Sequence, residues 1–81
     1  MNTYKLSNIP LRKFRTFLFE VGCERVSTSG GHEKWDRDGL ERPITLQSHI
    51  DPVPEHVVQN TLRCLGMTKK EFFNIYYTID Q

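Results

Sequence analysis

The chain has few residues that could cross-link it: only two of its 81 residues are cysteine, Cys23 and Cys64. They form neither a CxxC pair nor a dense framework, which argues against a zinc ribbon and against a disulfide-stapled secreted domain. We therefore expect both to be buried free thiols. A chain of this length is one domain, residues 1–81, whose single modest core buries only ~60% of the unfolded surface. Such a marginal domain is a candidate for support by a partner.

Long apolar runs are also missing. The first residues contain no apolar core of signal-peptide length, and no later stretch approaches the ~20 apolar residues of a membrane span. We expect a cytoplasmic protein with no membrane partner. The chain also has no large excess of charge of one sign, since it contains eleven basic and ten acidic residues and its formal net charge is +1. Bulk charge therefore neither supports nor excludes nucleic-acid binding, and a basic patch would have to come from local placement.

The first predicted element is a helix that begins at Pro10, because proline is tolerated in the first helical turn. Gly22 supplies a stop signal at its other end. Apolar residues at helical spacing predict its buried stripe: Leu11, Phe14, Leu18 and Val21. Phe17 and Phe19 lie off that stripe, and we interpret them either as the flank of the core or as a contact surface for another chain.

Three strands are predicted next, over residues 23–28, 33–37 and 40–47, with Asp38-Gly39 as the hairpin turn between the last two. This order indicates an antiparallel meander. In the third strand Leu40, Ile44 and Leu46 share one face, which should lie against the helices. Pro43 places this strand at an edge or at a bulge, because proline has no backbone N–H to donate.

Alternation along the second strand separates two sets of side chains. Trp35 and Glu33 share one face, while His32, Lys34 and Asp36 share the other. Tryptophan belongs to the core by size. His32 and Lys34 are therefore expected on the open face of the sheet, where a long polyanion could lie.

A second helix is predicted over residues 54–65, between Pro54 and Gly66. Thr68 and Glu71 have the spacing of a capping box, which predicts a short last helix over residues 69–77. The chain contains no repeat, linker or low-complexity tract. The predicted order is helix, three strands, helix, short helix, in one α+β layer pair.

The stretch 27–35 carries the residues best suited to chemistry. Gly30-Gly31 leaves the backbone free to adopt positive φ, and His32 follows directly. A histidine has an ordinary pKa of ~6.5 and exchanges protons near neutral pH. Lys34 is the natural candidate to stabilise a phosphate. The residues alone leave open that His32 is an ordinary surface histidine in a turn and that Lys34 is a solvated surface lysine.

Two further histidines are less informative. His49 could be a second acid or base, a phosphate contact, or a polar residue that ends a strand, and His56 is expected to be structural. They lie seven residues apart, separated by Pro52 and Pro54, and no carboxylate completes a familiar set of ligands. We therefore expect no metal site.

Basic residues gather in two places. Arg12, Lys13 and Arg15 cluster at the start of the first helix, and the predicted strands carry three more, which are Arg25, Lys34 and Arg37. The helix cluster is either a nucleic-acid contact or a merely solvated face.

Taken together, residues 9–76 resemble the HicA-type toxins, which are small bacterial mRNA interferases of toxin–antitoxin systems. The likeness rests on the order and spacing of several parts. These are the proline-led helix closing in Leu18-Phe19-Glu20-Val21-Gly22, the turn Gly30-Gly31-His32 followed by Lys34-Trp35, a strand ending at His49, and the stretch Leu62-Arg63-Cys64-Leu65-Gly66-Met67-Thr68 through Glu71-Phe72.

The resemblance implies an α-β-β-β-α fold like that of double-stranded-RNA-binding domains, with a three-stranded antiparallel sheet and a short C-terminal helix. It implies a metal-independent endoribonuclease without a cofactor, which cleaves mRNA in the bacterial cytoplasm and is masked by a cognate HicB-type antitoxin. His32 takes the catalytic position, and Lys34 and His49 are its possible assistants. The residues expected to contact RNA are Gly30, Gly31, Lys34, Arg12, Lys13 and Arg15.

The chain departs from the family pattern at two points. Gly31 stands where a serine is usual, which removes a hydroxyl that could orient phosphate or histidine. Gln47-Ser48 replaces a commoner proline-containing lead into His49. The alternative interpretation is a non-catalytic module that holds RNA or a protein on the same fold.

Overall fold

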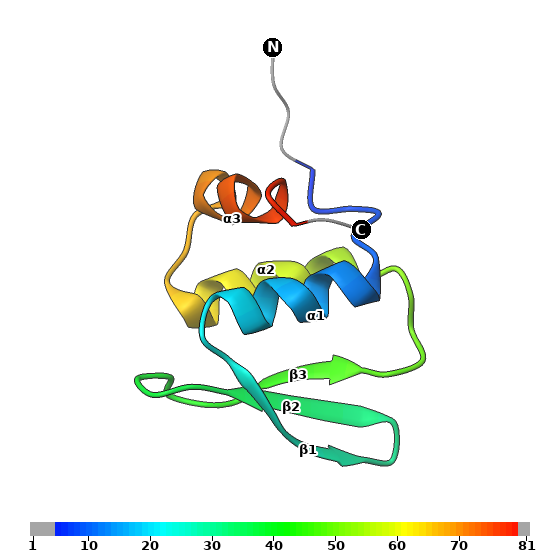
Figure 1. Cartoon of the computed structure of the whole chain (residues 1–81). Helices are drawn as coiled ribbons and strands as arrows, with labels where there is room; N and C mark the ends of the chain where they lie inside the picture. The colour runs from blue at the N-terminus through cyan, green and yellow to red at the C-terminus, as the bar shows by residue number, and fades with distance from the viewer. Residues whose placement is uncertain (1–4, 80–81) are drawn as a thin grey trace.

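Helices cover one face of a three-stranded antiparallel sheet and leave its other face open (Figure 1). The computed structural model describes residues 5–79. Its elements are α1 (Leu11–Glu20), β1 (Glu24–Ser29), β2 (His32–Asp36), β3 (Ile44–Gln47), α2 (Glu55–Leu65) and α3 (Lys69–Tyr76). In Figure 1, α1 and α2 lie between the sheet and α3. The predicted α+β class and the order of elements are confirmed.

Helix α1 buries three of the four residues of the predicted stripe and one residue beyond it. Leu11, Phe14 and Leu18 are in the core, and so is Phe17, whose exposed fraction is 0%. Val21, the fourth residue of the stripe, follows the helix as its C-cap and is only half-buried. Phe17 is buried because α3 covers a second side of α1: its ring lies edge-on to that of Phe72, with 4.7 Å between centroids. The interpretation of Phe17 as core flank is therefore the right one. Phe19 is 67% exposed.

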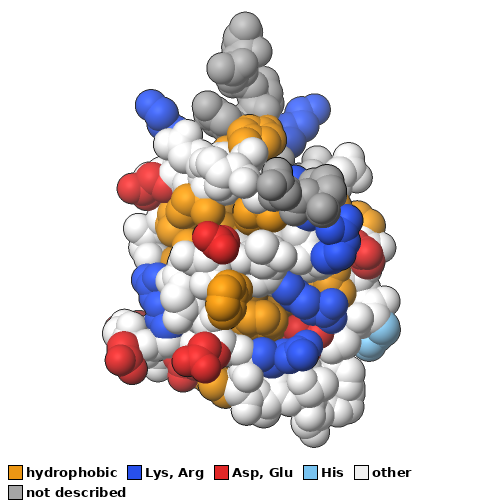
Figure 2. All heavy atoms as spheres, viewed as in Figure 1, with side chains coloured by type: hydrophobic (Ala, Val, Ile, Leu, Met, Phe, Trp, Pro, Cys, Tyr) orange, Lys and Arg blue, Asp and Glu red, His pale blue; other side chains and the backbone are white. Residues whose placement is uncertain are grey.

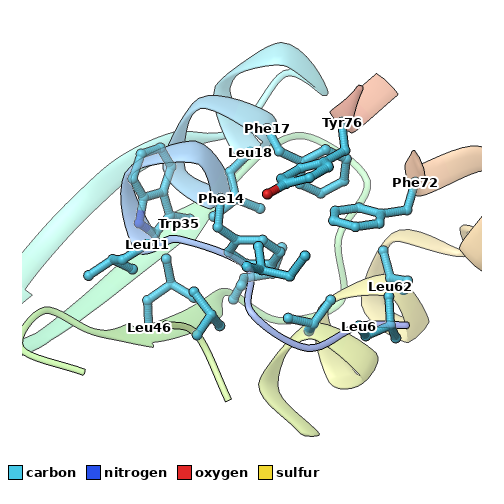
Figure 3. Close-up of a cluster of buried hydrophobic side chains, with 14 of the residues drawn as sticks. Leu6, Leu11, Phe14, Phe17, Leu18, Trp35, Leu46, Leu62, Phe72 and Tyr76 are labelled. Atoms are coloured by element: carbon cyan, nitrogen blue, oxygen red, sulfur yellow. The ribbon is translucent and has the colours of Figure 1, made fainter. Parts of the chain in front are cut away.

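The centre of the core is aromatic and sits between the sheet and α3 (Figure 3). Phe14 and Phe17 from α1 meet Phe72 and Tyr76 from α3, and Phe72 stacks on Tyr76 with 5.3 Å between centroids. Trp35 and other side chains of the sheet close the core from the opposite side (Figure 3). Such ring pairs stabilise the packing beyond the area they bury.

The hairpin between β1 and β2 turns on two glycines. Gly30 and Gly31 have φ of +58° and +81°, as the two central residues of a type I′ turn require. The turn brings Ser29 opposite His32. Strand β1 starts and ends one residue later than predicted, and β2 starts at His32 rather than at residue 33. The register shifts once, at a bulge between Arg25 and Ser27.

Strand β3 is shorter than predicted. It covers Ile44–Gln47, so the predicted strand 40–47 is wrong in its first half. Residues 37–43 form a loop, and Asp38-Gly39 turns within this loop rather than joining two strands directly. Pro43, which has no backbone N–H to donate, directly precedes the strand. Ile44 and Leu46 are buried as expected, and β3 is an edge strand, as Pro43 indicated.

The last two helices begin and end close to the predicted signals. Gly66 caps α2, and α3 carries the predicted capping box. The Glu71 N–H donates to the Thr68 hydroxyl oxygen at 3.1 Å, and the Thr68 N–H donates to the Glu71 carboxylate at 2.8 Å. None of the helices within residues 5–79 is long and apolar enough to cross a membrane.

The two cysteines differ in exposure. Cys23 is buried, as predicted, and Cys64 is exposed on α2, so the prediction of a buried thiol at position 64 is wrong. Helical spacing places Cys64 two residues after Leu62, which faces the core, and therefore on a different side of α2.

Candidate active site

The open face of β2 presents a histidine and a lysine side by side. His32 and Lys34 are exposed, while Glu33 and Trp35 are buried on the opposite face. The alternation predicted from the sequence is confirmed for these four residues. Both polar side chains therefore project from a strand that is fixed to the core by its other side.

Two polar residues of β3 flank this pair. Gln47 lies opposite His32, and Thr45 lies opposite Lys34. The Ser48 N–H donates to the Gly31 carbonyl at 2.8 Å, which sets the phase of the ladder and makes both of these pairs non-hydrogen-bonded ones. In such pairs the Cβ atoms are ~4.5–5.5 Å apart. Gln47 and Thr45 are thus site residues that the sequence prediction did not single out, because it gave their face but not their register.

His49 packs against the Gly30-Gly31 turn that joins β1 to β2. A β-carbon added at Gly31 would be 3.1 Å from Nδ1 and 3.2 Å from Cε1 of His49. The imidazole therefore packs directly over the glycine that precedes His32. The two histidines therefore lie at one end of the sheet, one following Gly31 in the chain and the other packed against it.

A buried carboxylate holds the strand beneath the site. Glu33 is 1% exposed and accepts hydrogen bonds from Arg15 Nε at 3.2 Å, Trp35 Nε1 at 3.0 Å and Ser48 Oγ at 2.7 Å. A second nitrogen of Arg15, Nη2, completes a two-pronged ion pair with Glu33. Burial alone would raise the pKa of Glu33, but the hydrogen bonds from Arg15, Ser48 and Trp35 outweigh it and lower this pKa to about 2.

This network joins α1, β2 and the end of β3 at one point. Glu33 lies directly between His32 and Lys34 in the sequence, and Ser48 directly precedes His49. Fixing Glu33 and Ser48 therefore fixes the backbone that carries the exposed groups. The sequence indicated only that Glu33 faces inward, since its partners come from distant segments.

The basic cluster of α1 does not join the site. The Arg15 guanidinium is engaged by Glu33, and the Lys13 ammonium lies 4.1 Å from the centroid of the Tyr76 ring. Arg12 is exposed on the same helix. The helix α1 covers one face of the sheet (Figure 1). His32 is exposed on the face opposite the buried Glu33 and Trp35, so the cluster and the His32 side chain belong to different sides of the sheet. Basic side chains gather between α1 and the sheet in Figure 2.

His56, which the sequence predicted to be structural, lines the same pocket as His32. It is exposed in the first turn of α2, and it lines with His32 and Gln47 one pocket of about 340 Å³. Within residues 5–79, no three side chains of His, Cys, Asp or Glu are grouped so that they could hold a metal ion.

Comparison with protein-family models, with curated proteins and with solved structures gave no match to this chain.

Proposed function

We propose that the protein is a metal-independent endoribonuclease of the HicA type, the toxin component of a toxin–antitoxin pair, and that it cleaves mRNA. The observation that carries the proposal is the pairing of His32 with Lys34 on the open face of a strand whose other face is locked into the core. An acid–base group and a cation are thereby presented together to solvent on a rigid element.

RNA cleavage requires a base for the 2′-hydroxyl proton, a donor for the leaving oxygen, and positive charge near the phosphate. His32 supplies the base, because an imidazole nitrogen can accept the proton of a hydroxyl. Lys34 contributes charge to the phosphate oxygens. The amide of Gln47, opposite His32, offers a further donor to the phosphate or to the 2′-oxygen.

His49 is the assisting acid in this proposal. Its ring packs on Gly31 and so stands at the same end of the sheet as His32. Two histidines can divide the proton transfers, one accepting from the nucleophile and the other donating to the leaving oxygen. Gly30 and Gly31 leave the backbone of the turn open to a phosphate.

We infer a fold similar to double-stranded-RNA-binding domains, because the α+β order and the single antiparallel sheet are compatible with it. A HicB-type antitoxin would inhibit the enzyme by covering the open face of the sheet, in the bacterial cytoplasm. Arg12 and Lys13 could add contacts to the phosphate backbone from α1, whereas Arg15 serves the Glu33 ion pair.

The test compares three proteins on a long transcript in the presence of EDTA. Wild type and Asn74→Ala, a change at an exposed position of α3, should release the same RNA fragments, and His32→Ala should release none. Binding of the transcript by wild type and by His32→Ala without cleavage by either would refute the enzyme and favour the alternative, a non-catalytic RNA- or protein-binding module.

A further inference from the structure

A groove runs along the outer edge of β3, between this strand and α2. Two hollows form it. The larger, about 800 Å³, is lined by the loop before β3 and by α2, and the smaller one is the pocket that contains His32. Thr45 and Val57 line both hollows, so the two are neighbours along this edge. Together they extend from the loop 37–43 to the pocket lined by His32.

The floor of the groove offers backbone hydrogen bonds. Among the described strands, β3 pairs only with β2. The Ser48–Gly31 bond sets the phase of that ladder, so the N–H and C=O of Thr45 point away from β2, toward the edge along which the groove runs. An edge of this kind can bind an extended chain through its backbone groups.

The far end of the groove is basic. Arg37, Arg42 and Arg63 line it, against Glu41 as the acidic residue of the same lining. Arg42 and Arg63 are exposed, and Arg63 donates a hydrogen bond to the Asn60 side-chain oxygen at 3.2 Å. Arg37 donates one hydrogen bond to the Val21 carbonyl. The whole chain carries a formal net charge of only +1, so this local excess is a property of the groove. Guanidinium groups bind phosphate oxygens in a two-pronged geometry.

We propose that this groove binds the backbone of single-stranded RNA, with Arg42 and Arg63 contacting phosphates and the strand leading along Thr45 to His32. The proposal rests on the proposed function for its choice of polyanion, because a strand seated in the groove reaches the histidine at its other end. It also replaces Arg15 as an RNA contact, since the guanidinium of Arg15 is engaged by Glu33.

The experiment measures binding of a fluorescently labelled single-stranded RNA in which every 2′-hydroxyl is methylated, so that it cannot be cleaved through that oxygen. The double variant Arg42→Glu/Arg63→Glu is compared with Lys69→Glu/Lys70→Glu, which makes the same charge change at exposed positions of α3. We expect the groove variant to lose about tenfold or more in affinity and the control about twofold or less, because only the former loses phosphate contacts.

A second readout uses wild-type protein and does not depend on the folding of a variant. Cys64 lines the groove and is exposed, whereas Cys23 is buried. Saturating methylated RNA should slow alkylation of Cys64 at least about fivefold, as expected for a thiol covered by bound ligand. An unchanged alkylation rate with RNA bound would overturn the proposal.

Measuring both RNA binding and RNA cleavage distinguishes a failure of the groove from a failure of the proposed endoribonuclease. Equal losses in both double variants, or binding in the groove by an acidic peptide but not by RNA, would contradict the RNA groove. If Arg42→Glu/Arg63→Glu cleaves RNA as fast as wild type, the endoribonuclease is supported and RNA binding in the groove is refuted. If RNA binding depends on the groove but wild type cleaves no RNA, RNA binding in the groove is supported and the endoribonuclease is refuted.

Discussion

The imidazole of His49 lies against the α-carbon of Gly31, so close that a β-carbon there would be 3.1 Å from Nδ1. The absence of a side chain at position 31 and the position of the second histidine are therefore physically connected. The glycine leaves the space that this ring occupies.

Gly31→Ser should consequently impair the protein rather than improve it. Its φ of +81° disfavours any side chain, at a cost of about 1–3 kcal/mol, and the new β-carbon would displace His49. Urea unfolding and RNA cleavage measure the two effects. Gly31→Ala is the matched control, because it adds the β-carbon without the hydroxyl. Faster cleavage by Gly31→Ser than by wild type, with no gain in Gly31→Ala, would show that the hydroxyl helps and that our account of Gly31 is wrong.

The hydrogen bonds to Glu33 should make the free energy of unfolding depend on pH in the acid range. The pKa of the Glu33 carboxyl group is lowered from 4.5 to about 2 in the folded state. The carboxylate therefore stabilises the fold fully above its unfolded pKa, and this contribution is lost as the pH falls from about 4.5 toward 2. The shift corresponds to about 3 kcal/mol. Urea unfolding at a series of pH values measures it.

Glu33→Gln should be less stable than wild type at neutral pH and should lose much of this acid dependence. Glu41→Gln is the control, since Glu41 is exposed in the loop before β3. An acid dependence in Glu33→Gln as steep as that of wild type would mean that other carboxylates cause it.

Asp51 should stabilise α1 from forty residues away. Its Oδ1 accepts a hydrogen bond from the Leu11 N–H at 2.9 Å, and Pro10, at the N-cap, makes no side-chain cap of its own. Asp51→Ala should lower the free energy of unfolding by about 1 kcal/mol, and Asp51→Asn, which keeps an acceptor, by less. Chemical denaturation provides the values. Equal stability of Asp51→Ala and wild type would show that this cap contributes nothing.

The two thiols should react at very different rates. Cys64 is exposed, and burial raises the pKa of the Cys23 thiol, so that less of its reactive thiolate forms. A thiol-specific reagent should modify one equivalent quickly in native protein and the second only after unfolding. Cys64→Ser should abolish the fast phase. Two equally fast thiols in the native protein would contradict the placement of Cys23.

The sequence predicted most of the fold because its signals are local. Pro54 and Gly66 bracket α2, Thr68 and Glu71 cap α3, and strict alternation separates His32 from Trp35. Such features depend on neighbours within a few residues. They set the element types and the face on which each strand residue lies.

What the sequence did not predict depends on tertiary packing. Phe17 is buried because α1 is covered on two sides, which the periodicity of one helix does not reveal. Arg15 pairs with a carboxylate eighteen positions away, and Gln47 joins His32 through strand register. The proximity of His49 to Gly31 follows from the same register and from the chain direction after β3.

We propose that His32 promotes attack of a 2′-hydroxyl on the adjacent phosphate. The most direct measurement is the initial rate of cleavage, in EDTA, of one single-stranded RNA and of its fully 2′-O-methylated copy, by wild type and by His32→Ala. We predict rapid cleavage only for wild type acting on unmodified RNA. Cleavage of the methylated strand by wild type, or undiminished cleavage of RNA by His32→Ala, would contradict the account.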